Sequence, residues 1–126
     1  MPKFGERSEK NLEGLHPDLL KVMRTAIIAT PIDFMVIDGL RTLAEQKELV
    51  KKGASWTLKS RHLTGKAVDV MAWVNGTGRW EAKLYQQIGE HVLRIAEQLN
   101  IPLVWGGSWK VRDWGHFELD KNHYGY

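Results

Sequence analysis

The sequence contains no cysteine, and this absence limits both its covalent and its metal chemistry. Without thiols, the 126-residue chain forms no disulfide, offers no thiolate nucleophile and holds no metal ion through sulfur. Any metal centre must therefore be built from histidine, aspartate and glutamate side chains.

Long apolar stretches are also missing. The longest, at residues 26–29 and 34–37, fall far short of the roughly 18 residues that span a bilayer, so we expect no stable membrane association. The first seven residues are not followed by the apolar core of a signal peptide. This pattern predicts synthesis in the cytoplasm without a signal peptide.

No internal repeat, low-complexity tract or Pro/Gly-rich linker divides the chain. A chain of 126 residues is too short for two independent hydrophobic cores. We therefore predict one domain that spans residues 1–126.

Neither the charge nor the aromatic residues indicate a nucleic-acid-binding protein. The 18 Lys and Arg against 15 Asp and Glu give a net charge of +3, which permits a polyanionic partner without requiring one. The six tryptophans do not alternate with basic residues along a strand, as a platform for stacking bases would require. We therefore expect no nucleic-acid partner.

The spacing of apolar residues predicts three helices. Pro17 begins the first, at residues 17–30, because the first helical position loses nothing without an amide hydrogen. Thr42 caps the second, at residues 42–52. The longest covers residues 81–100 and carries an apolar stripe at three- and four-residue spacing.

Short apolar runs rich in strand-forming residues predict four strands, at residues 33–38, 67–73, 102–105 and 115–119. Irregular structure or turns are expected at residues 1–14, 54–66 and 75–78. Helices and strands are mixed without a repeating βαβ pattern. This order predicts an α+β fold with a small antiparallel sheet flanked by helices.

Two short segments gather the residues that could carry chemistry. In the first, SRHLTGKAVD (residues 60–69), a histidine in a loop precedes a glycine turn and an aspartate on a strand. Alternation places Asp69 on the face opposite Val68 and Val70. A carboxylate in so apolar a strand is costly to bury unless it is paired or binds a metal ion.

The second segment is DWGHFEL (residues 113–119). Alternation places His116 and Glu118 on one face of a strand and the apolar Phe117 on the other. The polar pair would then face a cleft, with Asp113 close by. Either carboxylate could serve there as a general base.

His62, Asp69 and His116 would make a suitable set of zinc ligands, since three protein ligands leave a fourth position for water. Zinc lowers the pKa of such a water towards about 7 and polarises a carbonyl, which is the chemistry of amide hydrolysis. The alternative is two ordinary hydrogen-bonded histidines, with Asp69 in an ion pair with Arg41 or Arg61.

The other histidines and the nearby tryptophans are not expected to carry chemistry. His16 is expected to cap a helix, His91 to lie at a helix surface and His123 in a polar tail. Trp105, Trp109 and Trp114 bracket the proposed site and are expected to shape its walls.

Together these motifs resemble a family of zinc peptidases. Ser60-x-His62-x-x-Gly65-x-Ala67-x-Asp69 with Asp113-x-x-His116 is similar to the VanY-like D-alanyl-D-alanine carboxypeptidases and dipeptidases. The resemblance is strongest to phage endolysins that act as L-alanyl-D-glutamate endopeptidases, and it covers nearly the whole chain. Further matches are Phe4-Gly5-x-x-Ser8-Glu9-x-x-Leu12, His16-Pro17-x-Leu19, Asp33-Phe34, Gly39-x-Arg41-Thr42 with Gln46, and Trp105-Gly106-Gly107-x-Trp109.

The resemblance implies a Hedgehog/DD-peptidase-like α+β fold and a Zn²⁺ ion held by His62, Asp69 and His116. Asp113 would be the general base that takes a proton from the attacking water and returns it to the leaving amine. Arg41 would stabilise the developing oxyanion or a substrate carboxylate. Residues that support the ligands or contact the substrate would be Ser60, Gln46, Trp109, Trp114 and Glu118.

The implied function is an endolysin that cuts the peptidoglycan stem peptide between L-alanine and D-glutamate during host lysis. We expect a monomer without a separate cell-wall-binding domain, acting on periplasmic peptidoglycan after the membrane is permeabilised. Two alternatives stay open. One is a D,D- or L,D-carboxypeptidase that trims terminal D-alanine, and the other is an inactive zinc-containing module that binds the cell wall.

Overall fold

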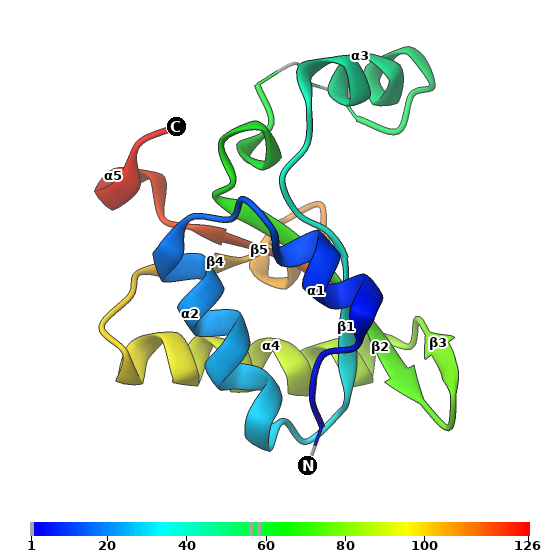
Figure 1. The fold of residues 1–126 in the computed structure, drawn as a ribbon, viewed down its shortest axis with the longest axis vertical. Helices are drawn as coiled ribbons and strands as arrows, with labels where there is room; N and C mark the ends of the chain where they lie inside the picture. Colours follow the sequence, from blue (N-terminus) through cyan, green and yellow to red (C-terminus); the bar gives the residue numbers. More distant parts are fainter. Residues whose placement is uncertain (1, 56, 58) are drawn as a thin grey trace.

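The computed structural model describes residues 2–55, 57 and 59–126, and its centre is a small antiparallel sheet. Strands β1, β2, β5 and β4 lie side by side in that order, and β3 pairs with the C-terminal end of β2 (Figure 1). The strands are β1 (Phe34–Asp38), β2 (Ala67–Val74), β3 (Thr77–Arg79), β4 (Leu103–Trp105) and β5 (His116–Leu119). The predicted α+β class and antiparallel sheet are confirmed.

Helices flank the sheet, and α2 packs against α4 beside it, while α3 lies at the opposite end of the molecule (Figure 1). The helices are α1 (Glu6–Leu12), α2 (Pro17–Ala26), α3 (Leu43–Lys51), α4 (Ala82–Gln98) and α5 (Lys121–Tyr124). Short 3-10 turns are η1 (Ile27–Ala29), η2 (Arg61–Thr64) and η3 (Gly106–Ser108).

Strand β2 separates the core from the functional face. Its residues Val68, Val70 and Ala72 are fully buried in the core. Asp69 and Met71, on the other face of the strand, are only partly buried. The period of two therefore turns one carboxylate out of an apolar strand, as the sequence predicts.

The local signals explain why the predicted helices form. Thr42 makes a capping box with Glu45. The Thr42 hydroxyl accepts from the Glu45 amide, and the Glu45 carboxylate accepts from the Thr42 amide. His16 caps α2 through Nδ1, which accepts from the Asp18 amide at 3.1 Å, as expected.

The prediction that residues 1–14 are irregular is wrong, because they contain α1. The helix covers the edge of β1: the Ser8 hydroxyl accepts from the Val36 amide, and the Asn11 amide donates to the Val36 carbonyl. These bonds satisfy backbone groups that an edge strand leaves open. Leu12 is the one buried apolar residue of this short helix, so the sequence shows no apolar period there.

Two other expectations need correction. The segment at residues 75–78 is a hairpin rather than a simple turn: Asn75 and Gly76 adopt positive φ of 54° and 76°, and β3 follows. His91 is buried instead of lying at the surface of its helix. Its Nε2 lies 2.8 Å from the Ala26 carbonyl oxygen and joins α4 to α2.

Candidate metal centre

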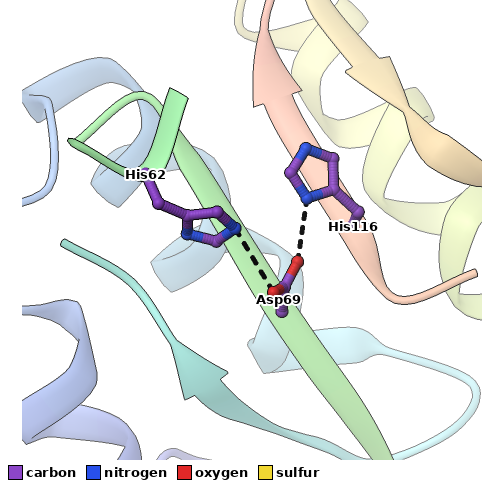
Figure 2. A group of neighbouring side chains, drawn as sticks. All are labelled: His62, Asp69 and His116. Carbon is purple, nitrogen blue, oxygen red and sulfur yellow. Dashed lines mark hydrogen bonds and ion pairs between the residues drawn. The ribbon is translucent and has the colours of Figure 1, made fainter. Parts of the chain in front are cut away.

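His62, Asp69 and His116 converge at one point although they come from three elements, η2, β2 and β5 (Figure 2). His62 Nε2 lies 3.3 Å from Asp69 Oδ2, and His116 Nδ1 lies 2.8 Å from Asp69 Oδ1. One ligand atom from each residue lies within 4.8 Å of the other two. Three donors at these separations can close around one ion.

Backbone geometry brings each ligand into place. Asp69 and His116 are register partners on neighbouring strands, so their side chains emerge side by side on one face. His62 sits in η2, where the Ser60 hydroxyl caps the turn by accepting from the His62 amide at 3.2 Å. Gly65 ends that turn with φ of 70°, a conformation that favours glycine.

The ring nitrogens that point away from the centre are already bonded. His62 Nδ1 donates to the Gly39 carbonyl oxygen at 2.8 Å, which leaves Nε2 for a metal. His116 Nε2 donates to Glu118 Oε1 at 2.8 Å, which leaves Nδ1. Such outer partners fix the ring orientation in metal sites. Two imidazoles and a carboxylate are also ligands that Zn²⁺ accepts, so the residues fit the ion.

Arg61 also belongs to this cluster. The sequence suggested it only as an alternative ion-pair partner of Asp69, and the structure pairs it with Glu118 instead. Arg61 Nη1 donates to Glu118 Oε2 at 3.0 Å, and the Arg61 side chain is buried. A chain of bonds thus runs from Arg61 through Glu118 to the ligand His116. The only sequence signal was the position of Arg61 next to His62, because its partner lies 57 residues away.

Arg41 lines the cleft, and its guanidinium already contacts other side chains of the protein. Its Nη2 forms an ion pair with Asp38 and lies 4.0 Å from Asp69 Oδ2, while Nη1 donates to Gln46 Oε1 at 2.7 Å. Gln46 is fully buried and also donates to the Ser55 hydroxyl. These contacts hold the guanidinium beside the metal ligands.

Asp113 and Glu118 differ in how free their oxygens are. Both oxygens of Glu118 are bonded, one to His116 and one to Arg61. Asp113 Oδ2 lies 3.9 Å from His116 Nδ1, and 58% of its side chain is exposed. The geometry leaves Asp113 open to the cleft as a proton acceptor.

Burial and charge shift the pKa values of these groups. Burial would raise the pKa of Asp69, but hydrogen bonds with His116 and His62 hold it well below its usual range. Burial would lower the pKa of His116, but its bonds to Asp69 and Glu118 raise it to about 9. Burial and the Asp69 charge raise the pKa of Asp113, which favours a base near neutral pH.

A cleft of about 580 Å³ opens above the three ligands. Ser60, Trp109, Asp113 and Glu118 are among its lining residues, and the Trp109 ring lies 5.2 Å from the His116 ring. The residues that complete the lining are Arg41, Leu49, Ala54, Ser55, Thr57, Lys59, Arg61, His62, Asp69, Val111, Arg112 and His116.

The expectation that Trp105 and Trp114 form walls of the site is not met, because neither residue lines the cleft. The Trp114 ring packs 5.9 Å from the ring of Trp105, which is part of the core. The sequence placed Trp114 near the site because it follows Asp113, but the turn before β5 directs its ring towards Trp105.

The sequence of the chain matches the family described as phage L-alanyl-D-glutamate peptidase over residues 1–125. The L-alanyl-D-glutamate peptidase of Escherichia phage T5 is 32% identical, covering 97% of this chain and 92% of the relative. The crystal structure of the Serratia marcescens L-Ala D-Glu endopeptidase ChiX is 45% identical, with a TM-score of 0.92. It covers 99% of this chain and 96% of ChiX.

A more distant structure supports the fold. The D,D-pentapeptidase VanY, solved in complex with Zn(II), has a TM-score of 0.51 and 18% identity, covering 82% of this chain and 68% of VanY. This likeness concerns the arrangement of helices and strands. On the match along its sequence and the identity of its relatives, the chain belongs to the phage L-alanyl-D-glutamate peptidase family.

Proposed function

We propose that the protein is a zinc-dependent peptidase that hydrolyses the bond between L-alanine and D-glutamate in the peptidoglycan stem peptide. The observation that carries the proposal is the convergence of His62, Asp69 and His116 under an open cleft. The family match and the 45% identity to an L-Ala D-Glu endopeptidase point to the same bond.

His62 Nε2, an Asp69 oxygen and His116 Nδ1 would hold the ion. When bound, zinc would polarise the scissile carbonyl and lower the pKa of a nearby water. Gly39 and Glu118 keep the two imidazoles oriented through their outer nitrogens.

Asp113 carries the proton through the reaction. Its carboxylate takes a proton from the attacking water as the water oxygen bonds to the L-alanine carbonyl carbon. The same carboxyl group then gives the proton to the D-glutamate nitrogen as the carbon–nitrogen bond breaks. The freedom of its oxygens and its raised pKa support this role over Glu118.

Arg41 stabilises the negative charge that develops on the carbonyl oxygen. It lines the cleft within 4.0 Å of Asp69, and Asp38 and Gln46 fix its position. A donor that is held in place before the reaction stabilises a transition state without reorganising. Trp109 also lines the cleft, with its ring 5.2 Å from the His116 ring.

The site of action is the cell wall, which the enzyme reaches once the inner membrane is permeabilised. Within the described residues, no helix is long and apolar enough to cross a membrane. We take the enzyme to work as a monomer and a single catalytic domain over residues 1–126, with the stem peptide as its partner.

Digestion of purified Gram-negative peptidoglycan tests the proposal. Mass spectrometry should identify muramyl products that end in L-alanine and released peptides that begin with D-glutamate. Products that have lost only a terminal D-alanine would contradict it and indicate a carboxypeptidase. Binding to the wall without any product would instead indicate an inactive wall-binding module. The matched control is Asp113→Ala, which should retain zinc and release peptides about 10²- to 10⁴-fold more slowly.

A further inference from the structure

The positive charges that line the cleft are not equivalent. Arg41 is paired with Asp38, and Arg61 with Glu118. Lys59 and Arg112 also line the cleft and are exposed. Across the part of the chain that the structure describes, no carboxylate lies within ion-pair distance of either side chain. Beside Arg41, which is assigned to the carbonyl oxygen, the cleft therefore holds two cations whose charge no carboxylate of the described residues neutralises.

Of these two side chains, Arg112 is the one whose charged group packs on a neighbouring ring. Its guanidinium carbon lies 5.2 Å from the centroid of the Trp114 ring, in a cation–π contact. Trp114 in turn packs on the core residue Trp105, and the Trp105 indole donates to the Trp114 carbonyl oxygen at 2.8 Å. A planar guanidinium on a fixed aromatic ring can present two N–H groups to one carboxylate, whereas a lysine ammonium cannot match that geometry.

The position of Arg112 selects which carboxylate it meets. It precedes Asp113, which serves the leaving amine in the proposed reaction, so both side chains project from one short loop. The leaving residue is D-glutamate, whose amine and α-carboxylate are attached to the same carbon. When the next residue is attached through the side-chain carboxyl, that α-carboxylate remains free beside the amine.

We propose that Arg112 binds the α-carboxylate of the D-glutamate residue, so that the enzyme selects stem peptides with a free α-carboxylate over peptides in which it is an amide. This inference rests on the proposed function. It assigns a specificity-determining role to a residue outside the metal site and the proton path. An amide in that position would present N–H groups to the guanidinium and would lack the negative charge that strengthens its hydrogen bonds.

Two synthetic stem peptides that differ only in this group, D-glutamate or D-isoglutamine, test the inference. Charge-assisted hydrogen bonds discriminate by roughly tenfold or more, so wild-type kcat/KM should favour the carboxylate peptide by about that factor. Arg112→Met should remove the preference by lowering kcat/KM for the carboxylate peptide alone. Arg112→Lys, which keeps the charge but not the planar fork, should recover part of the preference.

Lys110→Ala is the matched control, because Lys110 is an exposed cation on the same loop that does not line the cleft. It should leave the preference unchanged. Equal cleavage of both peptides by the wild type, or a preference that survives Arg112→Met, would overturn the inference while leaving the proposed function intact. Loss of the preference in Lys110→Ala would also overturn it, because net charge would then explain it. Failure to cleave either peptide at the Ala–Glu bond would overturn both proposals.

Discussion

Glu118 is not one of the three proposed metal ligands, but it contacts one of them and would support the proposed centre. Its two oxygens join the ligand His116 to the buried Arg61 at 2.8 Å and 3.0 Å. In Glu118→Gln one oxygen can still accept from His116, but the new amide N–H groups face the Arg61 donor. Outer-sphere changes of this kind cost about 10- to 100-fold in metal affinity.

We therefore expect Glu118→Gln to bind zinc about 10- to 100-fold more weakly than the wild type. Competition against a fluorescent chelator measures the affinity. Glu90→Gln, an exposed change on α4, is the control and should bind as the wild type does. An unchanged affinity in Glu118→Gln would show that the Arg61–Glu118 pair does not support the ligand.

In the proposed mechanism Asp113 transfers the proton and does not hold the metal ion. Because its side chain is not one of the three ligands, Asp113→Ala should lower kcat by about 10²- to 10⁴-fold, the usual contribution of a general base. Zinc content, measured on the same sample, should stay at the wild-type level. Full activity in Asp113→Ala would transfer the role of base to Glu118.

For single residues, the sequence predicted the proposed metal ligands better than the charged residues that hold the site in place. Histidine and carboxylate spacing predicted that His62, Asp69 and His116 meet, and the structure brings them within 4.8 Å. It did not predict the pairing of Arg61 with Glu118 or of Arg41 with Asp38. Each charged residue has several candidate partners along the chain, and only the folded chain selects among them.

The 3-10 turn η2 places His62, and it depends on the close approach of Gly65 to another loop. A Cβ at Gly65 would lie 2.6 Å from the Gly14 carbonyl oxygen. Gly53 has a similar φ of 76°, but no atom of the described residues lies within 4 Å of a Cβ placed there. The two glycines therefore differ in the contact and not in the backbone strain.

Gly53→Ala should cost about 1 kcal/mol of unfolding free energy, from the left-handed backbone alone. Gly65→Ala should cost several kcal/mol, because the clash adds to the same strain, and it should also weaken zinc binding by displacing His62. Urea unfolding and zinc competition measure the two effects. Equal losses in the two variants would show that the Gly65–Gly14 contact does not position η2.

Elements with a clear apolar period were predicted well. The α4 helix and the β2 strand lie where the sequence placed them, since a buried stripe and a buried run leave a signal. By contrast, α1 and β3 were missed. The first is held by polar bonds from Ser8 and Asn11, and the second has only three residues, so neither carries a periodic signal.

At the level of the whole molecule, the contacts of His116 with Asp69 and Glu118 predict how the stability of the metal-free protein depends on pH. His116 has its pKa raised from 6.5 to about 9 in the folded chain. A raised pKa means that the folded state holds the proton more tightly, so the stabilisation is complete below pH 6.5. It is lost as the pH rises through about 9. Since one pKa unit equals about 1.4 kcal/mol, this group contributes up to roughly 3 kcal/mol.

The melting temperature of the metal-free protein should therefore fall between pH 6.5 and pH 9. In the zinc-loaded protein the ion occupies Nδ1 in place of the proton, and the fall should be much smaller. Calorimetry of both forms over this range measures the difference. Parallel curves for the two forms would contradict the assignment of His116 as a ligand.

The direct test of the metal centre is a zinc titration of the metal-depleted protein, with turnover of an L-Ala–D-Glu stem peptide recorded at each addition. A centre made by His62, Asp69 and His116 predicts no turnover at the start and a linear rise that stops at one zinc per chain. Asp69→Asn should show no such rise over the same range. Full turnover in the metal-depleted protein, or in Asp69→Asn, would contradict the assignment of these three residues as the catalytic metal site.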